Sequence, residues 1–419
     1  MKALYDIIIV GAGPAGLAAA QAAAASGASI CIIDDNPFAG GQIWRGGPQQ
    51  QKDSRARELW QQVQQAPNIS VLHSARVLYA PAPGELLVQL EESASVLRYQ
   101  RLILATGARE LLLPFPGWTL PGVTGAGGLQ ALSKGAYPVD GKRVVVAGTG
   151  PLLLAVADTL RSRGAQVLAI IEQAPRAALV RFALGLLATP SKISQALQLG
   201  SRLRGVPYRS GRYVRAAFGE GQLQRVELDN GELIECDYLA VGYGLLPNTE
   251  LARSLGCAVG QGAVQVDEWQ RTSMPAIYCA GEGTGVGGVD LALAEGRIAG
   301  LHASRLAGAG GAASALAERA RWRRFAGRLA EAFRLREEIS KLAAPDTIVC
   351  RCEDVPHSDL AVHATWRAAK LHTRCGMGPC QGRICGAATA VLYGWQPDTV
   401  RTPISPARAG SIIATTTET

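Results

Sequence analysis

The sequence predicts an α/β fold with two βαβ-containing domains and a small cysteine-rich domain near the C-terminus. Three observations indicate this organisation. The stretch from Asp6 to Asp35 reads as apolar run, glycine-rich turn, alanine-rich helix and second apolar run, and the stretch from Gly141 to Glu172 repeats that order. Five of the 9 cysteines fall between Cys350 and Cys385. A length of 419 residues suits about two to four domains of ordinary size.

The first βαβ unit has the features of a dinucleotide site. Gly11 permits a tight turn, Gly13 lets a pyrophosphate approach the backbone, and Gly16 lets the helix pack closely on the strand. The start of the following helix offers backbone N–H groups to the phosphates, and an acid at the tip of the second strand can bond ribose hydroxyls. The residues predicted to hold the dinucleotide here are Gly11, Gly13, Pro14, Ala15, Gly16, Asp34 and Asp35.

The composition excludes several other functions. The net charge is +8, but no basic run is interleaved with stacking aromatic residues, so we expect no nucleic-acid partner. No uncharged apolar run reaches the ~18 residues of a transmembrane helix, and the opening residues MKALYD lead directly into a strand, so neither a membrane span nor a signal peptide is expected. We expect a cytoplasmic protein whose cysteines are core residues or metal ligands rather than disulfides.

The second βαβ unit carries an altered fingerprint. Gly148 and Gly150 match the first two glycines, Leu153 replaces the third, and Glu172 takes the place of the ribose-binding acid. Without the third glycine the helix cannot press as closely on the strand. Three interpretations stay open: a vestigial site, a nucleotide such as ATP held without hydride transfer, or NAD. The acid at the strand tip argues against NADP.

The C-terminal cysteines are spaced as metal ligands. Cys350 and Cys352 form a CxC pair, and Cys375, Cys380 and Cys385 follow after a helical stretch. Four thiolates from two short loops suit zinc or a [2Fe–2S] cluster. Zinc sites use CxxC pairs more often than CxC pairs, so the cluster is the preferred interpretation, with zinc and free thiols as alternatives.

Several segments resemble glutathione-reductase-like flavoproteins with two Rossmann-like domains. These are the GGQ segment at residues 40–42, the ATG turn at residues 105–107, and the segment IYCAGEGTG followed by a helix. The resemblance implies FAD in the first domain and a bond from the acid at position 282 to the ribityl chain, although the family usually has Asp there. The further residues that it implies for the cofactor are Gly41, Gln42, Val77, Ala105, Thr106, Gly107, Gly281 and Glu282.

The segment TRCGMGPCQGRIC resembles the ferredoxin-type domain related to bacterioferritin-associated ferredoxin (BFD-like). That resemblance implies a [2Fe–2S] cluster. In similar flavin-dependent glycerol-3-phosphate dehydrogenases the CQGxxC pair is present and the Cys375 position need not be cysteine. The implied ligands are therefore Cys350, Cys352, Cys380 and Cys385, with Cys375 as a neighbour.

Taken together, residues 6–411 resemble the FAD-binding α subunits of heteromeric bacterial dehydrogenases. These include opine oxidases, D-hydroxyproline and L-proline dehydrogenases, and hydrogen cyanide synthase. The resemblance implies a β subunit of the glycine-oxidase type that oxidises the amine, a small ferredoxin-like subunit in some complexes, and a respiratory-chain or other electron acceptor. It also allows FMN at a subunit interface and contact with a membrane through the complex.

The predicted domain boundaries follow from these segments. We expect an FAD domain at residues 1–118 and 264–306, a second nucleotide-binding domain at 119–263, a linker helix within 307–344, the BFD-like domain at 345–395 and an extended tail at 396–419. Residues 173–213 read as one or two helices that form either a covered domain face or a partner surface. No catalytic residue is assigned, because no CxxC lies near Gly41 and no nucleophile–base pair is evident.

The sequence therefore predicts an electron-transfer subunit that relays electrons through FAD and [2Fe–2S]. Two alternatives remain: a self-contained NAD(P)H-dependent flavin oxidoreductase that uses the second βαβ unit, and a nucleotide-binding scaffold that only positions another subunit.

Overall fold

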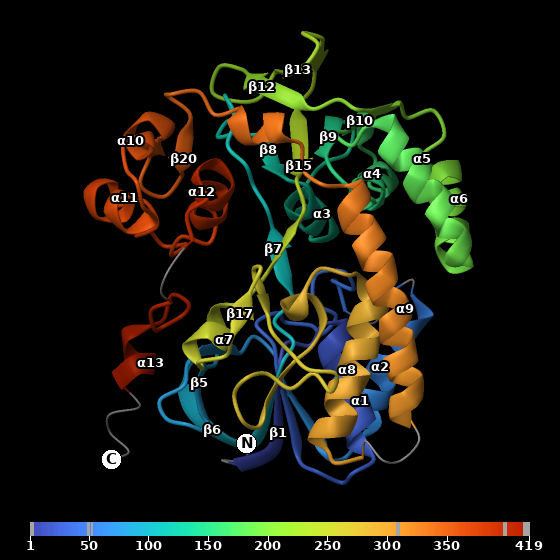
Figure 1. Ribbon diagram of the computed structural model, residues 1–419, viewed down its shortest axis with the longest axis vertical. Helices are drawn as coiled ribbons and strands as arrows, with labels where there is room; N and C mark the ends of the chain where they lie inside the picture. Colours follow the sequence, from blue (N-terminus) through green and yellow to red (C-terminus); the bar gives the residue numbers. More distant parts are fainter. Residues whose placement is uncertain (1–3, 48–50, 52, 307–310, 397–399, 414–419) are drawn as a thin grey trace. The chain divides into compact units, whose positions relative to one another are not determined.

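The computed structural model describes residues 4–47, 51, 53–306, 311–396 and 400–413 (Figure 1). The chain divides into two compact units. Unit 1 comprises Met1–Arg109, Leu246–Ala326 and Thr399–Thr419, and unit 2 comprises Glu110–Leu245 and Gly327–Asp398. This division is coarser than the boundaries expected from the sequence, which stay predictions.

Unit 1 is built on a parallel sheet. β1 (Leu4–Val10) lies between β2 (Ile30–Ile33) and β6 (Ala94–Leu104), while β3 (Ile69–Leu72) pairs with β2 and β19 (Ile277–Cys279) pairs with β6. The residues of β2 and the isoleucines of β1 are buried on both faces. This is why both strands read as uninterrupted apolar runs rather than alternating ones.

The strand β6 also belongs to an antiparallel extension. β4 (Arg76–Tyr79) and β5 (Glu85–Gln89) pair with each other, and β5 pairs with the first half of β6. The helix α2 occupies Ser54–Gln65, and the side chain of Asp53 accepts a hydrogen bond from the Arg55 N–H at its start.

Two helices of unit 1 pack with almost no space between their backbones (Figure 1). A Cβ atom on Gly296 or Gly300 of α8 (Val289–Ala303) would lie 2.2 Å from the carbonyl oxygen of Ala15 or Ala19, respectively, in α1 (Pro14–Ala24). Only glycine permits this approach. Smaller elements complete the unit: α7 (Glu250–Ser254), β17 (Val259–Gly260), β18 (Ala263–Val264) and η3 (Gly281–Thr284).

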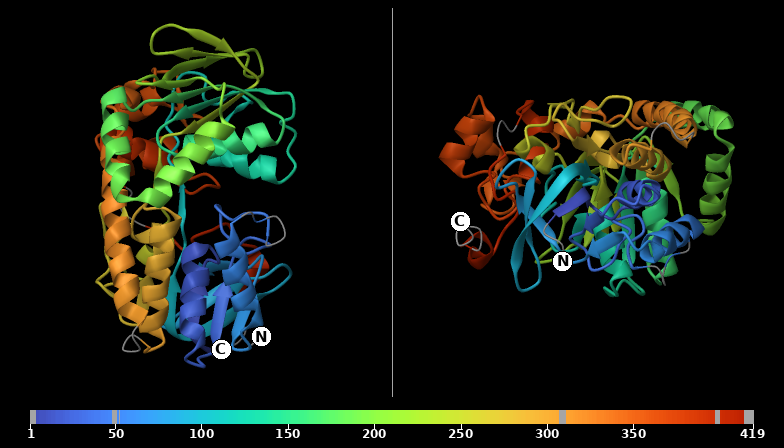
Figure 2. Two further views of the ribbon diagram at one scale, coloured as in Figure 1. Left: turned by 90° about the vertical axis from the view of Figure 1, so that its right-hand side faces the viewer. Right: turned by 90° about the horizontal axis from the view of Figure 1, so that it is seen from below.

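Unit 2 repeats the parallel architecture. Its sheet runs in the order β11-β10-β9-β15-β8, with α3 and α4 packed on it and a small antiparallel sheet β12-β13-β14 beyond (Figure 2). The chain enters the unit at β7 (Ala108–Glu110) and leaves it at β16 (Leu245–Pro247). The bounds are β8 (Val123–Gly125), α3 (Ala126–Lys134), β9 (Arg143–Gly148), α4 (Leu152–Ser162), β10 (Gln166–Glu172), α5 (Arg176–Gly185), η2 (Leu186–Ala188), α6 (Pro190–Arg202), β11 (Tyr208–Ser210), β12 (Val214–Phe218), β13 (Arg225–Leu228), β14 (Leu233–Glu235) and β15 (Tyr238–Gly242).

The cysteine-rich segment forms a lobe with its own small core. That core includes Val349, Leu360, Trp366, Ala388 and Trp395. The preceding chain contains α9 (Gly311–Ala332), where a charged helix was expected, and η4 (Glu337–Lys341). The lobe contains β20 (Ile348–Cys350), β21 (Val355–Pro356), α10 (His357–Ala361), α11 (Trp366–Thr373) and α12 (Cys385–Tyr393).

The C-terminal tail returns to unit 1. The Ile404 N–H donates to the Leu78 carbonyl at 2.9 Å, and the Arg408 N–H donates to Gln89 Oε1 at 2.9 Å. The sequence predicts an extended tail, but the structure adds a short helix, α13 (Ala409–Ile413). The last proline of the chain is Pro406, so no proline prevents a helical turn there.

Among the described residues, no helix is both long enough and apolar enough to cross a bilayer.

The contact between α1 and α8 can be tested at Gly300. Replacing Gly300 with Ala places a methyl group 2.2 Å from the Ala19 carbonyl oxygen, so we expect the free energy of unfolding to fall by about 1–3 kcal/mol through overpacking. The matched control is Gly327→Ala in α9, where a Cβ atom would meet nothing within 4 Å. The free energy of unfolding of this control should stay unchanged or rise by up to about 1 kcal/mol. Urea denaturation measures both, and equal stability of the two variants would contradict the packing described.

Candidate functional site

The first glycine-rich turn has the geometry that its spacing predicts. Gly11 has φ +105°, and a Cβ atom on it would lie 2.2 Å from the Ala105 carbonyl oxygen. A Cβ atom on Gly16 would lie 1.8 Å from the Gly11 carbonyl oxygen. Neither position therefore accepts a side chain, and α1 begins directly over the end of β1.

The GGQ segment folds onto this turn. The Gly40 N–H donates to the Ala12 carbonyl at 2.7 Å, and a Cβ atom on Gly41, whose φ is +60°, would lie 3.1 Å from the Cα atom of Gly13. Two bare backbones therefore face each other next to the start of α1. The first N–H groups of a helix have no acceptor within it, so this cradle suits a pyrophosphate. Gln42 follows at an exposed position.

Asp34, at the end of β2, holds the first glycine-rich turn through a hydrogen bond. Asp34 is 5% exposed. Its Oδ2 accepts a hydrogen bond from the Ala12 N–H at 2.5 Å, and its Oδ1 accepts from the backbone and side-chain nitrogens of Asn36 at 2.8 and 2.9 Å. The ribose contact predicted for Asp34 would have to share these oxygens. The sequence did not indicate that Asp34 also binds the backbone of the turn.

Two other residues predicted to bind the cofactor, Asp35 and Val77, differ in their exposure. The Asp35 side chain is 57% exposed and forms an ion pair with Arg76 Nη2 at 2.9 Å. The side chain of Val77 is buried in the core between β4 and its neighbours. Any contact of Val77 with a nucleotide would therefore come from its backbone.

The ATG turn is held by Asn248, a residue far from it in the sequence. Asn248 donates through its side chain to the Thr106 carbonyl at 2.9 Å and through its backbone to the Gly107 carbonyl at 3.0 Å. Thr106 Oγ1 donates in return to the Asn248 carbonyl at 2.8 Å. The Ala105 N–H donates to the Val10 carbonyl at 2.8 Å, which holds the turn beside Gly11.

Glu282 has one buried oxygen that no described group satisfies. Its Oε1 accepts a hydrogen bond from the Gly288 N–H at 2.9 Å, whereas its Oε2 is buried without a partner. Burial raises the pKa of this carboxyl group. A buried acceptor left unpaired costs about 1–3 kcal/mol, so a hydroxyl donor from a bound cofactor fits this position. This agrees with the expected ribityl contact of FAD.

A buried acid that the sequence analysis missed, paired with a partly exposed arginine, holds the loop of Glu282. Glu295, on α8, is 1% exposed and accepts hydrogen bonds from the Gly281 N–H at 3.0 Å and from Thr284 Oγ1 at 2.7 Å. Its other oxygen pairs with Arg323 of α9 at 3.0 Å. The available signal was a single acid within the apolar run from Leu291 to Ile298.

A buried acid also binds the backbone of the second glycine-rich turn. Glu172 has no exposed surface, and its two oxygens accept hydrogen bonds from the N–H groups of Gly150 and Ala174, both at 2.8 Å. Burial raises the pKa of Glu172. The side chain of Leu153 packs against Gly242. A Cβ atom on Gly242 would lie 3.7 Å from Leu153 Cδ2. Gly148 keeps φ +136°.

Residues 333–336 cover this second turn. Gln173 is fully buried and donates through Nε2 to Thr149 Oγ1 at 2.9 Å and to the Arg334 carbonyl at 3.0 Å. Its Oε1 accepts a hydrogen bond from the Arg336 N–H at 3.0 Å. Phe333 Cγ lies 4.0 Å from where a Cβ atom on Gly150 would be. The covering segment therefore lies across the carboxyl ends of β9 and β10, where open α/β sheets bind their nucleotides.

The five C-terminal cysteines come together in unit 2. The sulfur atoms of Cys350, Cys375 and Cys385 lie within 4.8 Å of one another. Cys380 is hydrogen-bonded to Cys385 and to Cys352, which is exposed. The four ligands predicted from the sequence thus belong to one group, and Cys375 belongs to it as well.

The surroundings of this group suit thiolate ligands. The hydrogen bond from Cys385, supported by backbone bonds from Ile384 and Gly382, lowers the pKa of Cys380 to about 5. A Cβ atom on Gly378 would lie 2.3 Å from the Cβ atom of Cys352, and one on Gly376 would lie 2.6 Å from the Trp366 ring. Glycines therefore let the loop wrap closely, and clustered thiolates are the donor set that zinc and iron–sulfur clusters use.

The other four cysteines form no redox pair. Cys31, Cys236, Cys257 and Cys279 are free and buried, and burial raises the pKa of Cys31 to about 12. Disulfide chemistry needs two neighbouring, reactive thiols. The described residues of unit 1 offer none beside the glycine-rich turns.

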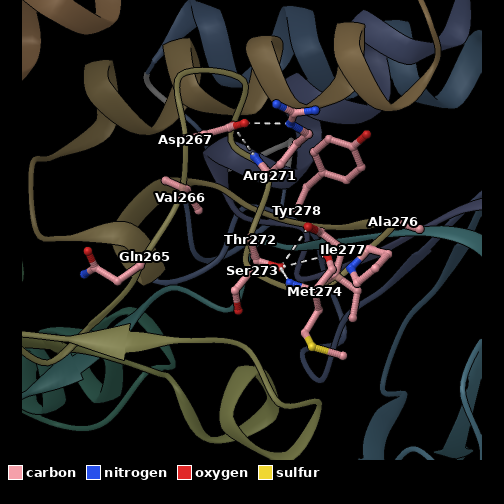
Figure 3. Close-up of a pocket in the computed structure, with 11 residues that line it drawn as sticks. Gln265, Val266, Asp267, Arg271, Thr272, Ser273, Met274, Ala276, Ile277 and Tyr278 are labelled. Atoms are coloured by element: carbon pink, nitrogen blue, oxygen red, sulfur yellow. Dashed lines mark hydrogen bonds and ion pairs between the residues drawn. The ribbon is translucent and has the colours of Figure 1, made fainter.

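A separate cavity of about 630 Å³ lies in unit 1 (Figure 3). It is lined by residues 265–267 and 271–278, which include the ion pair between Asp267 and Arg271 at 2.6 Å. These residues precede β19 or form its start, whereas the glycine-rich turns follow the carboxyl ends of their strands. The cavity is therefore at the opposite edge of the sheet and does not belong to the nucleotide site.

Comparison with known proteins agrees with this geometry. Residues 5–305 match the family model described as pyridine nucleotide-disulphide oxidoreductase. The chain is 32% identical to the HcnB component of hydrogen cyanide synthase from Pseudomonas aeruginosa, over 90% of each chain. It is 33% identical to an opine oxidase subunit of Rhizobium meliloti, over 98% of each chain.

Solved structures share the fold. L-proline dehydrogenase from P. horikoshii superposes with a TM-score of 0.69 at 20% identity, covering 98% of this chain and 79% of that one. T. acidophilum thioredoxin reductase gives 0.55 at 23% identity, covering 73% of this chain and 99% of the other. The chain therefore belongs to the pyridine nucleotide-disulphide oxidoreductase family, a flavoprotein family, and within it to the group of heteromeric dehydrogenase subunits that includes HcnB and the opine oxidase relative.

Proposed function

We propose that this protein is the electron-transfer α subunit of a heteromeric dehydrogenase that oxidises an amino acid or an opine. The observation that carries the proposal is the group of five thiols in a family member that lacks a disulfide redox pair among its described residues. The relatives that match almost the whole chain are named as subunits of opine oxidase and hydrogen cyanide synthase. Substrate oxidation is assigned to a partner β subunit of the glycine-oxidase type.

Unit 1 is proposed to hold FAD through its glycine-rich turn, the GGQ segment, the ATG turn and the loop of Glu282. The bare backbones of Gly13 and Gly41 admit the pyrophosphate, and the unpaired oxygen of Glu282 accepts a ribityl hydroxyl. Asp34 keeps the turn in shape whether or not it also meets the ribose. When bound, FAD supplies two-electron chemistry and an iron–sulfur cluster supplies one-electron chemistry.

The cluster ligands are proposed to be Cys350, Cys352, Cys380 and Cys385, with Cys375 as a buried neighbour. The structure pairs Cys352 with Cys380, and it places Cys350 beside both Cys375 and Cys385. Cys375, which lies within 4.8 Å of Cys350 and Cys385, is the alternative to Cys385 as the fourth ligand. Zinc is the alternative occupant of the same thiolates.

The second glycine-rich turn distinguishes this proposal from an NADH-dependent oxidoreductase. Its ribose-binding acid, Glu172, is fully buried and bonded to the backbone. Residues 333–336 cover the carboxyl ends of the neighbouring strands. Both features support the proposal that no NADH or NADPH binds at this turn. The electrons are therefore proposed to come from the partner subunit.

The proposed cluster predicts different outcomes for two cysteine variants. Cys380→Ser removes a ligand, so iron content and the visible iron–sulfur absorption should both be lost while the flavin absorption stays. Cys375→Ser, the matched control within the same group, should retain iron. Metal analysis and absorbance of the anaerobically purified protein measure both. Loss of iron in Cys375→Ser with retention in Cys380→Ser would contradict the proposed ligands, and stoichiometric zinc without iron in the wild type would contradict the cluster.

The proposed electron source predicts how the flavin is reduced. In the isolated chain, neither NADH nor NADPH should bleach the flavin absorption under anaerobic conditions, and D-hydroxyproline, proline, opines and glycine should not either. Dithionite should bleach it, which serves as the control. In the complex co-purified with its β subunit, one of the amines should reduce the flavin. Rapid bleaching of the isolated chain by NADH would overturn the proposal in favour of the self-contained oxidoreductase.

A further inference from the structure

The first two clustered cysteines are attached to a tryptophan from the start of unit 2. Trp118 lies in the segment between β7 and β8, and its Nε1–H donates to the Ile348 carbonyl at 2.6 Å. Ile348 begins β20, which ends at Cys350. This hydrogen bond therefore fixes the chain two residues before the first of the proposed cluster ligands.

Trp118 also contacts the residue between the two cysteines. The guanidinium carbon of Arg351 lies over the Trp118 ring, 5.2 Å from its centroid. The face of an aromatic ring attracts a cation, and the Trp ring does so most strongly. Among the described residues no acid forms an ion pair with Arg351, whereas the nearby Arg374 is paired with Glu353 at 2.7 Å. The charge of Arg351 is therefore positioned by an aromatic ring and is not neutralised by a carboxylate.

Trp118 is held firmly enough to position another side chain. It is 4% exposed, and its backbone N–H donates to the Phe115 carbonyl at 3.0 Å. The preceding residue, Gly117, has φ +81°, and a Cβ atom on it would lie 1.9 Å from the Ala217 carbonyl oxygen. The Ala217 N–H in turn donates to the Pro116 carbonyl at 2.9 Å. The segment that carries Trp118 is therefore fixed to β12.

A small, mostly apolar cavity adjoins Arg351 and Trp118. Its volume is about 10 Å³, which is room for about one water. Its lining includes Phe115, Val123 and Val241, and Arg351 is the only charged residue among those that line it. Arg351 is exposed elsewhere, but on this side little water separates its side chain from the protein. The charge is therefore less screened here than that of a fully hydrated arginine.

We propose that Trp118 and Arg351 are positioning residues that raise the reduction potential of the iron–sulfur cluster. This inference rests on the cluster proposed above. A cluster bound by four thiolates is negatively charged, and one-electron reduction adds a further negative charge. A fixed cation between two ligands of the chain favours the reduced state, because net charge and surroundings set the potential of such clusters. The cluster then accepts electrons more readily from the reduced flavin.

Redox titration of the anaerobically purified full chain, followed by electron paramagnetic resonance, tests this proposal. Arg351→Gln removes the cation, so the equilibrium constant for one-electron reduction of the cluster should fall about three- to tenfold, a downward shift of about 28–59 mV. Arg351→Lys keeps the charge and should retain most of the wild-type potential. The matched control is Arg367→Gln on α11, which removes another exposed arginine of the cysteine-rich lobe. It should shift the potential much less.

A double-mutant cycle tests whether Trp118 acts through Arg351. Trp118→Phe loses the N–H donor and attracts the guanidinium less strongly, so it should lower the potential of the otherwise wild-type protein. The same substitution should have less than half that effect when Arg351→Gln is already present, because residues that act through one contact are not additive. Iron content and circular dichroism establish that each variant holds the cluster and is folded.

Three results would overturn the inference. An equal shift in Arg351→Gln and Arg367→Gln would show that only the net charge of the lobe matters. Full additivity of Trp118→Phe and Arg351→Gln, or loss of iron from Trp118→Phe, would show that Trp118 does not act through Arg351. These results leave the proposed function intact. A wild-type protein that contains no iron would instead remove the proposed cluster, and this inference with it.

Discussion

A carboxylate at the end of the second strand holds the glycine-rich turn in each unit. In unit 1, Asp34 accepts a hydrogen bond from the Ala12 N–H, and in unit 2, Glu172 accepts one from the Gly150 N–H. Each bond joins two strand ends across the mouth of a βαβ unit. The shape of both turns, and hence any nucleotide chemistry at them, depends on this contact. The same hydrogen bond occupies a carboxylate oxygen that would otherwise be available to a ribose hydroxyl.

The two turns differ in what lies over them. In unit 1, the neighbours are glycines, an unpaired oxygen of Glu282 and a helix start that offers N–H groups. In unit 2, Gln173 binds the chain segment of Arg334 and Arg336 over the turn. One duplicated architecture thus supports an open cofactor cradle in the first unit and a turn covered by its own chain in the second. This difference supports the proposal that the electrons come from a partner subunit and not from a nucleotide at the second turn.

Much of this organisation could be predicted from local sequence patterns. Glycine spacing and apolar runs predicted both βαβ units, because those signals depend on residues close in the chain. The bracing by Asn248 and the Glu295–Arg323 ion pair could not be predicted, because their partners lie far apart in sequence. No local pattern indicates that residues 333–336 return to the second turn. For Cys375, spacing alone could not show that it joins Cys350 and Cys385.

The central claim is that the chain carries a flavin together with an iron–sulfur cluster. Electron paramagnetic resonance of the anaerobically purified, dithionite-reduced protein tests it most directly. The account predicts the signal of a reduced [2Fe–2S] cluster, with about one unpaired electron per chain attributable to the cluster, in a sample that also releases FAD on denaturation. A protein that contains FAD and zinc, and gives no such signal after anaerobic purification, would contradict it.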